Sequence, residues 1–570
     1  MNNIKKLFSI ALCTSVILTN VNFNSKAAVL IPKPVTHGMV ASDHYLASKA
    51  GSDILKMGGN AFDAAVATSL VLSVVRTQST GIGGGGFMVI HSAKGENIVV
   101  DYREIAPAKA TRDMYLDKNK KPIPNLSTKG YKAIGIPGNL AGLDYVLKKY
   151  GTMKFKDVAK FAIKYAEFGF QIDEHFSGAA KTVNKKGALS GLKALVFRNG
   201  QPKEVGEQQK NIELAKTLKI ISEKGVQDFY KGSIAKKIVA AMQKNGGIIT
   251  LNDLANYKPK VRKPLMGTYR GYDIVTMPPP SSGGIALIET LNIMENYNLG
   301  WNSSGYESSK HIHTLTEAMK HSFADRAEYL GDPDFVKIPL SQLISKDYAK
   351  KLKNKIDQTK TLDSSDYGLK SLRNKAPISD AGTTHYSIID KSGNTVAATE
   401  TINTYFGSQV VIPNTGIVMN NQMDDFSVQA GVPNSFGLIG NENNSIKAGK
   451  KPLSSMSPTI ILKNKKPFMI VGASGGPRII TGTLQAIMNV IDFGMNVEEA
   501  VSSPRFHHQW SPNKLFIEKE IPLDVRENLI KKGHILSLGE AENAVQAILI
   551  KDGKITGASD PRKGGFPEGY

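Results

Sequence analysis

The chain has 570 residues, of which 41% are hydrophobic, 21% charged and 7% aromatic, and this composition excludes a globally disordered protein. Its length allows one very large domain or two to four ordinary ones. The formal net charge of +22 indicates a general attraction to anions. However, lysines in the helical stretches are interleaved with apolar residues and no nucleic-acid-binding motif is present, so we expect no nucleic-acid partner.

The first 27 residues have the pattern of an export signal. Lys5 and Lys6 precede an apolar run from Leu7 to Leu18, and Ser25-Lys26-Ala27 offers small residues at the cleavage positions. The apolar run is shorter than the roughly 20 residues of a membrane-spanning helix. We therefore expect residues 1–27 to be removed and the mature protein to be periplasmic or secreted.

Cys13, the only cysteine, lies inside this signal segment. Leu12 precedes it, where a lipoprotein signal has a small residue, so a lipid anchor is disfavoured. The mature chain therefore has no disulfide, thiol nucleophile or thiolate metal site. No later segment reaches 18 continuous apolar residues, so we expect no stable membrane insertion.

The first part of the mature chain alternates strand-like and helix-like patterns. A short strand is expected at 37–42, two helices broken by Gly58-Gly59 at 44–75, and a hairpin turned at 93–97 within 87–104. Residues 140–350 are mostly helical by periodicity. Pro278 to Gly284 interrupts this helical part before a helix at 285–297.

The character of the chain changes near Thr383. Residues 350–382 are lysine-rich and poor in large apolar side chains, so we expect a mobile segment there. Strands joined by tight turns are then expected at 385–390, 394–402, 415–421, 458–472 and 545–560, with one helix pair at 480–494 and 496–504. The chain is therefore predicted to be an α+β or layered α/β protein whose sheet uses both ends of the sequence.

Three formal motif matches are expected to be structural. Gly81–Gly86 fits the dinucleotide pattern G-x-G-x-x-G, but a strand follows it instead of a helix, so we expect tight backbone packing or approach to a ligand. His313, Glu317 and His321 have the helical spacing of metal ligands, yet the sequence lacks H-E-x-x-H. His507-His508 is likewise expected to have packing and hydrogen-bonding roles. A serine hydrolase elbow is also absent from the sequence.

Thr383 has a chemical use if the chain is cut just before it. A new N-terminal threonine carries a hydroxyl and an α-amine with a pKa of about 7.7–8.0, and the amine can take the hydroxyl proton as the oxygen attacks a carbonyl. Before the cut this nitrogen is an amide, so the precursor should be inactive. Gly382 tolerates the strained backbone angles of an acyl shift. Taken alone, however, this stretch also fits an ordinary loop-to-strand junction.

Nine motifs, in order along essentially the whole mature chain, resemble the γ-glutamyltranspeptidase family. They are GGNAFDAAVA, TGIGGGGFMVI, DYREIAPAKATRDMYLD, TTHYSIID, NNQMDDF, PLSSMSPTI, GASGGPRIITGTLQ, PRFHHQW and GASDPR. The resemblance implies an N-terminal-nucleophile hydrolase fold, a four-layer αββα sandwich. It also implies self-cleavage into a large subunit, residues 28–382, and a small subunit, residues 383–570, which together form one intertwined domain.

The family resemblance also assigns roles to individual residues. Thr383 would be the nucleophile, and Thr401 would support it through hydrogen bonds. Backbone N–H groups of Gly475 and Gly476 would stabilise the oxyanion. The substrate-binding residues would divide into one set for the α-carboxylate (Arg103, Ser454 and Ser455) and one set for the α-ammonium (Asp425, Gln422 and Asn403).

The implied function is γ-glutamyl transfer and glutathione hydrolysis, with glutathione and other γ-glutamyl compounds as donors and amino acids or dipeptides as acceptors. No metal or organic cofactor is implied. One departure from the family pattern concerns the lid over the pocket, where relatives often have tyrosine and this chain has Phe436. Phenylalanine cannot donate a hydrogen bond near Asn403, so we expect a more weakly held lid.

Two other functions remain open from the sequence. A related acylase would act on glutaryl or poly-γ-glutamate substrates, although a glutaryl site has no use for Asp425. An exported solute-binding protein would remain one polypeptide, whereas a self-cleaving enzyme separates into two bands after denaturation.

Overall fold

The computed structural model describes residues 32–300, 305–368, 382–539 and 542–570, and residues 32–570 form one compact unit. The predicted signal peptide lies outside the described residues, as do residues 369–381 of the predicted mobile segment. Of the remainder of that segment, residues 350–355 belong to helix α14 (Lys346–Lys355), where Leu352 is buried. The expectation of mobility is therefore wrong for this helical part.

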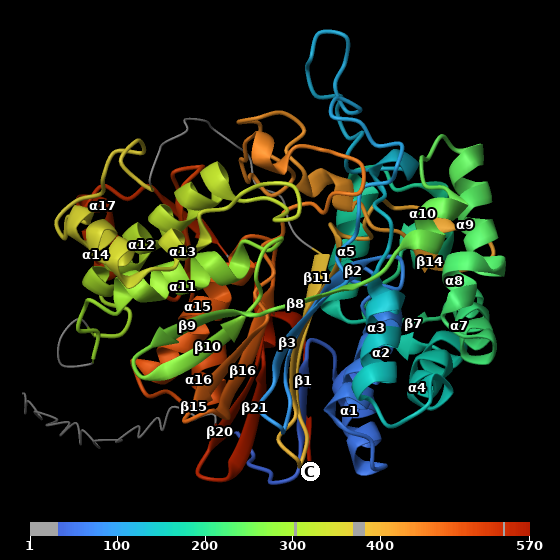
Figure 1. The fold of residues 1–570 in the computed structure, drawn as a ribbon, viewed down its shortest axis with the longest axis horizontal. Helices are drawn as coiled ribbons and strands as arrows, with labels where there is room; N and C mark the ends of the chain where they lie inside the picture. The colour runs from blue at the N-terminus through green and yellow to red at the C-terminus, as the bar shows by residue number, and fades with distance from the viewer. Residues whose placement is uncertain (1–31, 301–304, 369–381, 540–541) are drawn as a thin grey trace, which may run out of the picture. The chain divides into compact units, whose positions relative to one another are not determined.

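Two antiparallel sheets form the centre of the protein (Figure 1). The first has seven strands in the order β22-β1-β11-β12-β2-β3-β8. Their bounds are β1 Met39–Ser42, β2 Gly85–His91, β3 Asn97–Asp101, β8 Lys260–Arg262, β11 Gly382–Ile389, β12 Thr395–Asn403 and β22 Glu568–Gly569. Strands from both sides of Thr383 therefore alternate within one sheet.

The second sheet has six strands in the order β21-β20-β16-β15-β10-β9. Their bounds are β9 Leu265–Tyr269, β10 Tyr272–Thr276, β15 Thr459–Lys463, β16 Lys466–Ser474, β20 Ala544–Lys551 and β21 Lys554–Ser559. β11 packs against β16 between the sheets. The contact requires Gly472, because a Cβ there would lie 2.3 Å from the His385 ring.

Helices cover the outer faces of both sheets (Figure 1). The first sheet is covered by α1 (Tyr45–Lys56) and α2 (Ala61–Val75), with α3 (Asn139–Tyr150), α4 (Phe155–Phe168) and α7 (Ile212–Lys224) packed outside them. The second is covered by α11 (Gly283–Met294), α15 (Arg478–Ile491) and α16 (Val497–Ser502), with α12 (Ser309–Tyr329) and α14 packed outside α11. This is the four-layer αββα sandwich that was predicted.

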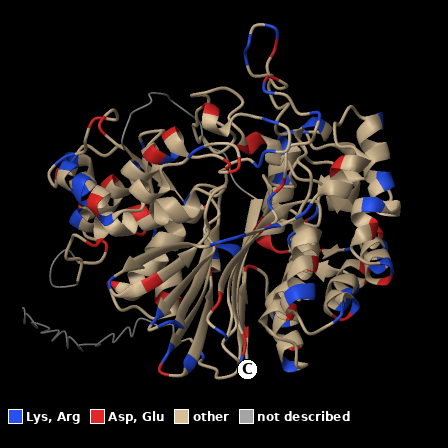
Figure 2. Ribbon diagram, viewed as in Figure 1, with Lys and Arg blue, Asp and Glu red and all other residues tan. Residues whose placement is uncertain are grey.

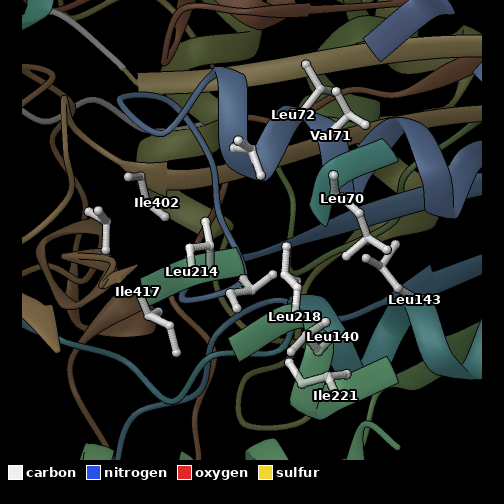
Figure 3. Packing of buried hydrophobic residues seen from close by; sticks show 14 of the residues in the cluster. Leu70, Val71, Leu72, Leu140, Leu143, Leu214, Leu218, Ile221, Ile402 and Ile417 are labelled. Carbon is white, nitrogen blue, oxygen red and sulfur yellow. The ribbon is translucent and has the colours of Figure 1, made fainter. Parts of the chain in front are cut away.

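The core follows from the apolar pattern of α2. All 15 of its residues are buried, as expected for a helix that is apolar on every side. Figure 3 shows part of one buried cluster, to which Leu70, Val71 and Leu72 of α2 contribute together with residues of α3, α7 and β12. This cluster packs the outer helices against the first sheet.

Shorter elements surround the sandwich. The helices are α5 Glu174–Lys185, α6 Ser190–Val196, α8 Gln227–Lys231, α9 Ser233–Lys244, α10 Leu251–Asn256, α13 Leu340–Leu343 and α17 Leu523–Lys531. The strands are β4 Phe170–Gln171, β5 Phe197–Arg198, β6 Gln201–Pro202, β7 Gln208–Gln209, β13 Val411–Ile412, β14 Ile417–Val418, β17 Phe506–His507, β18 Leu515–Glu518 and β19 Leu536–Gly539.

The predicted elements of the sandwich are confirmed, including the helix break at Gly58-Gly59, the β2–β3 hairpin and the pair α15–α16. The strand expected at 415–421 is shorter, because only Ile417–Val418 pairs as β14. Helix α17 was not predicted. Its apolar residues are largely exposed, with Leu529 as its buried contact, so it lacks a strong helical stripe.

Lysines and arginines are spread over the outer helices together with acidic residues (Figure 2). In α4, Lys156, Lys160 and Lys164 are exposed while Val158 and Ala162 are buried. This confirms the interpretation of the lysine-rich stretches as solvated helix faces. Among the described residues, no helix is long and apolar enough to cross a membrane.

Candidate functional site

The nucleophile predicted from the sequence lies at an irregularity in the first sheet. Gly382 pairs with Asn403 while the next residue, Thr383, pairs with Thr401, so a β-bulge leaves Ile402 without a partner on β11. Side chains alternate between the faces of a strand, and directly opposed residues share a face. The bulge therefore places the hydroxyls of Thr383 and Thr401 3.1 Å apart.

The Thr401 hydroxyl is fully used in this arrangement. Its single proton goes to the carbonyl oxygen of Gly382 at 2.5 Å, and its oxygen accepts the N–H of Asn403 at 2.8 Å. Because a hydroxyl has one proton and two lone pairs, the remaining contact makes Thr383 a donor to Thr401. Thr401 therefore both polarises the carbonyl before Thr383 and orients the Thr383 oxygen.

Glycines make room for this pair of threonines. A Cβ on Gly382 would lie 2.7 Å from the carbonyl oxygen of Gln78 and 2.8 Å from that of Thr404, and one on Gly84 would lie 2.2 Å from that of Thr401. Gly382 does not have a positive φ, so in this structure a glycine is required there by the close approach of these carbonyls. Its tolerance of strained angles during an acyl shift remains a prediction. Gly81–Gly86 shows the tight backbone packing that was predicted.

Gly475 and Gly476 connect β16 to helix α15. Both have positive φ, 123° and 58°, which side chains rarely adopt. The Gly475 carbonyl accepts the N–H of Arg478 in the first turn of α15. Since the C=O and N–H of a trans peptide point in opposite directions, the Gly476 N–H points away from the helix.

Nine of the ten predicted site residues line one small cavity of about 20 Å³, and Gly475 adjoins it in the chain. The nine are Arg103, Thr383, Thr401, Asn403, Gln422, Asp425, Ser454, Ser455 and Gly476. A volume of this size holds about one water molecule. The structure thus brings the predicted residues together around one narrow space.

Two of the charged residues that line the cavity form an ion pair with each other. Arg103 Nη2 lies 2.5 Å from Asp425 Oδ2, and Gln422 Nε2 donates to the same oxygen at 2.7 Å. Burial raises the pKa of the Asp425 carboxyl, while the Arg103 guanidinium acts in the opposite direction. Asn403 lines the cavity, but its side-chain amide donates to Asn421 O. The two predicted charge-binding residues therefore bind each other here.

The Ser454–Ser455 segment rests on a loop that the sequence marked only as an interruption between helices. Ser454 N donates to Pro280 O at 2.9 Å, while Ser282 N and Ser282 Oγ donate to Ser454 O at 2.8 and 2.7 Å. This loop leads into α11. Its hydrogen bonds to the Ser454 backbone fix the position of the serine pair.

Lys563 is a further candidate functional residue, which the sequence analysis did not identify. Its Nζ contacts the carbonyl oxygen of Thr383, lies 2.8 Å from Asp43 Oδ2 and donates to Ser474 Oγ at 3.1 Å. Lys563 directly follows the C-terminal GASDPR motif, so the motif was the available signal. It links the strand of Thr383 to β16.

Phe436 lines the cavity and is buried. It belongs to an apolar cluster with Phe323, Leu438 and Trp510, and Gln509 Nε2 donates to its backbone carbonyl at 3.1 Å. Packing therefore holds this residue in place of a tyrosine hydroxyl. The weaker lid remains a prediction.

His313, Glu317 and His321, which have the helical spacing of metal ligands, make separate contacts in the structure. His321 Nδ1 accepts the N–H of Gly368, whereas His313 lies 2.8 Å from His534. His313, Glu317 and His534 could reach a common ion, but the Lys320 ammonium lies 2.8 Å from Glu317. His507 and His508 are also buried and hydrogen-bonded, to Thr481 and Asn513 among others. These contacts agree with the structural roles expected from the sequence.

Comparison with known proteins gives the family. The sequence profile described as gamma-glutamyltranspeptidase matches residues 47–570. The glutathione hydrolase proenzyme of Escherichia coli (strain K12) is 46% identical over 545 residues, 95% of this chain and 93% of that protein.

Two solved structures agree with this assignment. The cephalosporin acylase from Bacillus halodurans matches with a TM-score of 0.84 at 28% identity, covering 97% of this chain and 99% of that chain. The gamma-glutamyltranspeptidase from Helicobacter pylori matches with a TM-score of 0.57 at 46% identity, covering 59% of this chain and 96% of that chain. The fold is that of the N-terminal-nucleophile hydrolases, and the protein is an enzyme. The chain belongs to the γ-glutamyltranspeptidase family.

Proposed function

We propose that the protein is a γ-glutamyltransferase and glutathione hydrolase that activates itself by cutting its chain between Gly382 and Thr383. The observation that carries the proposal is the Thr401 hydroxyl, which touches both the Thr383 oxygen and the Gly382 carbonyl. The same cavity holds Arg103 and Asp425, the charges needed for a zwitterionic γ-glutamyl group. The products are the subunits 28–382 and 383–570.

Self-cleavage begins with attack of Thr383 Oγ on the carbonyl carbon of Gly382. Thr401 stabilises the negative charge that develops on the carbonyl oxygen. The peptide C–N bond then breaks, and the nitrogen gains a proton as the new α-amine. Water hydrolyses the resulting ester, which leaves a carboxylate on Gly382 and a free Thr383 hydroxyl.

Turnover uses the amine that cleavage creates. The α-amine of Thr383 takes the hydroxyl proton while the oxygen attacks the γ-carbonyl of the donor. Backbone N–H groups of Gly475 and Gly476 stabilise the oxyanion. Glutathione loses cysteinylglycine, whose amine takes a proton, and the γ-glutamyl ester passes to water or to the amine of an amino acid or dipeptide.

Substrate recognition replaces one ion pair with two. The α-carboxylate binds Arg103 and the Ser454–Ser455 segment, and the α-ammonium binds Asp425 with Gln422 and Asn403. Because Arg103 and Asp425 are paired in the free site, the head group must separate them. A ligand with only one of the two charges leaves the other residue buried and unpaired, which is costly. This favours γ-glutamyl over glutaryl donors.

Purified protein tests the proposal directly. Two bands in a denaturing gel, with Thr-Thr-His-Tyr at the N-terminus of the smaller one, support self-cleavage. Thr383→Ala should remain one chain and hydrolyse no γ-glutamyl-p-nitroanilide. An intact wild-type chain would contradict the mechanism and favour a binding protein. Higher activity on glutaryl or poly-γ-glutamate than on γ-glutamyl substrates would favour the acylase alternative.

The export signal forms a separate part of the proposal. We propose that residues 1–27 are removed on secretion to the periplasm or medium. N-terminal sequencing of the larger subunit from the native host should find Ala28 first. A larger subunit that begins at Met1 would contradict export by signal cleavage.

A further inference from the structure

Arg326 is a buried cation behind the serine pair. It lies on α12, its side chain is 5% exposed, and its Nε donates to Ser282 Oγ at 3.0 Å. Burial lowers its pKa to about 10, and the charge of Asp425 acts in the opposite direction. The guanidinium therefore stays ionised at neutral pH.

Arg326 differs from the other buried arginines of the described chain in having no acidic partner. Each of the other four forms an ion pair with a carboxylate: Arg76 with Asp173, Arg103 with Asp425, Arg478 with Glu542 and Arg505 with Asp560. Among the described residues, no Asp or Glu forms such a pair with Arg326. An unpaired buried charge is unfavourable, so this position is prepared for an anion that arrives with a ligand.

A short hydrogen-bond chain connects Arg326 to the predicted carboxylate site. Ser282 has one hydroxyl proton and donates it to Ser454 O at 2.7 Å, so Arg326 donates to the lone pair of Ser282. Ser454 O belongs to the peptide whose N–H is that of Ser455. A cation at the start of the chain polarises each bond in turn, which makes this N–H a stronger donor.

We propose that Arg326 is a positioning residue for the α-carboxylate of the substrate and acts through Ser282 on the Ser454–Ser455 peptide. This inference rests on the proposed function. It adds a second cation to the carboxylate side of the pocket, where Arg103 supplies the first. The site then has two arginines for one carboxylate and Asp425 for the ammonium.

Three anilides separate the two charges of the donor. γ-Glutamyl-p-nitroanilide carries both charges, glutaryl-p-nitroanilide carries only the carboxylate, and 4-aminobutyryl-p-nitroanilide carries only the ammonium. Arg326→Gln and Ser282→Ala should raise KM about tenfold for the first two and leave the third unchanged. Arg326→Lys should recover part of the loss. Asp425→Ala should impair the first and third substrates and spare the glutaryl compound.

Ser281→Ala is the matched control for Ser282→Ala. Ser281 Oγ makes the same kind of bond from the same loop, to Met456 O at 2.5 Å, without a contact to Arg326. Ser281→Ala should change the KM values of all three anilides by the same factor. Self-cleavage of every variant, measured on gels, should match wild type because the precursor bond carries no α-carboxylate.

The outcomes distinguish this inference from the proposed function. Wild-type protein that stays uncut and hydrolyses none of the anilides overturns the proposed function. If the wild type is active but the Arg326 and Ser282 variants hydrolyse all three anilides equally poorly, or fail to self-cleave, the proposed role of Arg326 is wrong. The proposed function is not affected by that result. If Arg326→Gln does not fold, Ser282→Ala decides the question, since it keeps the guanidinium and breaks the chain.

Discussion

At the residue scale, Thr401 would take part in two steps of the proposed mechanism. Its hydroxyl donates a hydrogen bond to the Gly382 carbonyl oxygen and accepts one from the Thr383 hydroxyl. A cut before Thr383 would release the Gly382 carbonyl and free the same proton for the Thr383 oxygen. In the proposed mechanism, one hydroxyl thus serves self-cleavage first and turnover afterwards.

Thr401→Val should slow self-cleavage about 100-fold, because it removes the donor to the Gly382 oxygen while preserving the shape of the side chain. The fraction of cut chain, followed on denaturing gels over time, measures this rate. Thr401→Ser keeps the hydroxyl and is the control, with a rate near that of wild type. Cleavage of Thr401→Val at the wild-type rate would assign the polarisation to another group.

Glu104 should make stability depend on pH. Burial raises its pKa to about 7, against the opposing effect of the Arg103 guanidinium, and Arg103 Nη1 lies 3.9 Å from Glu104 Oε2. Unfolded glutamate titrates near about 4.3. Between these values the folded protein holds a proton that the unfolded chain has lost, so the free energy of unfolding falls as pH rises, by about 1.4 kcal/mol per unit.

Glu104→Gln should therefore flatten the pH dependence of Tm between about pH 4.5 and 7. Above about pH 7 both states have lost the proton, and no further contribution from this group is expected. Glu223→Gln, at an exposed position, should leave the wild-type slope unchanged. Equal slopes for wild type and Glu104→Gln would show that this carboxyl does not set the dependence.

At the element scale, the bulge between β11 and β12 aligns the two threonines. Without the extra Ile402, Thr383 would face a different residue of β12, and a shift of one position turns a side chain to the other face. Gly382 permits this geometry because backbone carbonyls approach it closely. We therefore expect the bulge to be required for the proposed self-cleavage.

Gly382→Ala should slow self-cleavage at least about tenfold. A Cβ 2.7 Å from Gln78 O must displace backbone and so move Thr383 away from Thr401. Gel densitometry of the two bands gives the rate. Gly178→Ala, in α5 with open space around the added methyl, is the control and should cleave like wild type. Fast cleavage of Gly382→Ala would show that the bulge tolerates the shift.

At the scale of the whole molecule, the two predicted subunits share one sheet. β11, β12 and β22 come from the part after the proposed cut, and they alternate with β1 and β2 from the part before it. Each central contact between the subunits is a full strand pairing. Separation would break the sheet and expose both cores, so the subunits cannot part while folded.

The cut protein should therefore elute from gel filtration as one species that contains both bands. In increasing urea the two subunits should separate only in the transition in which the β-sheet signal in circular dichroism is lost. The uncut Thr383→Ala chain is the reference for the elution volume. Release of the small subunit in native buffer would contradict a shared sheet.

Much of the fold was predictable because its elements have strong local patterns. The predominantly apolar α2, the break at Gly58-Gly59 and the alternating β11 and β12 each follow from neighbouring residues. Helix α17 was not predicted, and strand β14 was predicted to be longer than its two residues. Both have a weak apolar signal and are defined by tertiary contacts. The site residues came from motif order, and the cavity brings together nine of the ten.

The sequence by itself determined the layered α/β class, the family and the set of side chains around Thr383. It did so because periodicity and motifs are written in consecutive residues. Only the tertiary structure decided how these side chains meet. Ser282 and Ser454 are 172 positions apart, and the Arg103–Asp425 pair spans 322 positions. Such contacts depend on how the layers pack against one another. No local pattern in the sequence specifies which distant residues will meet.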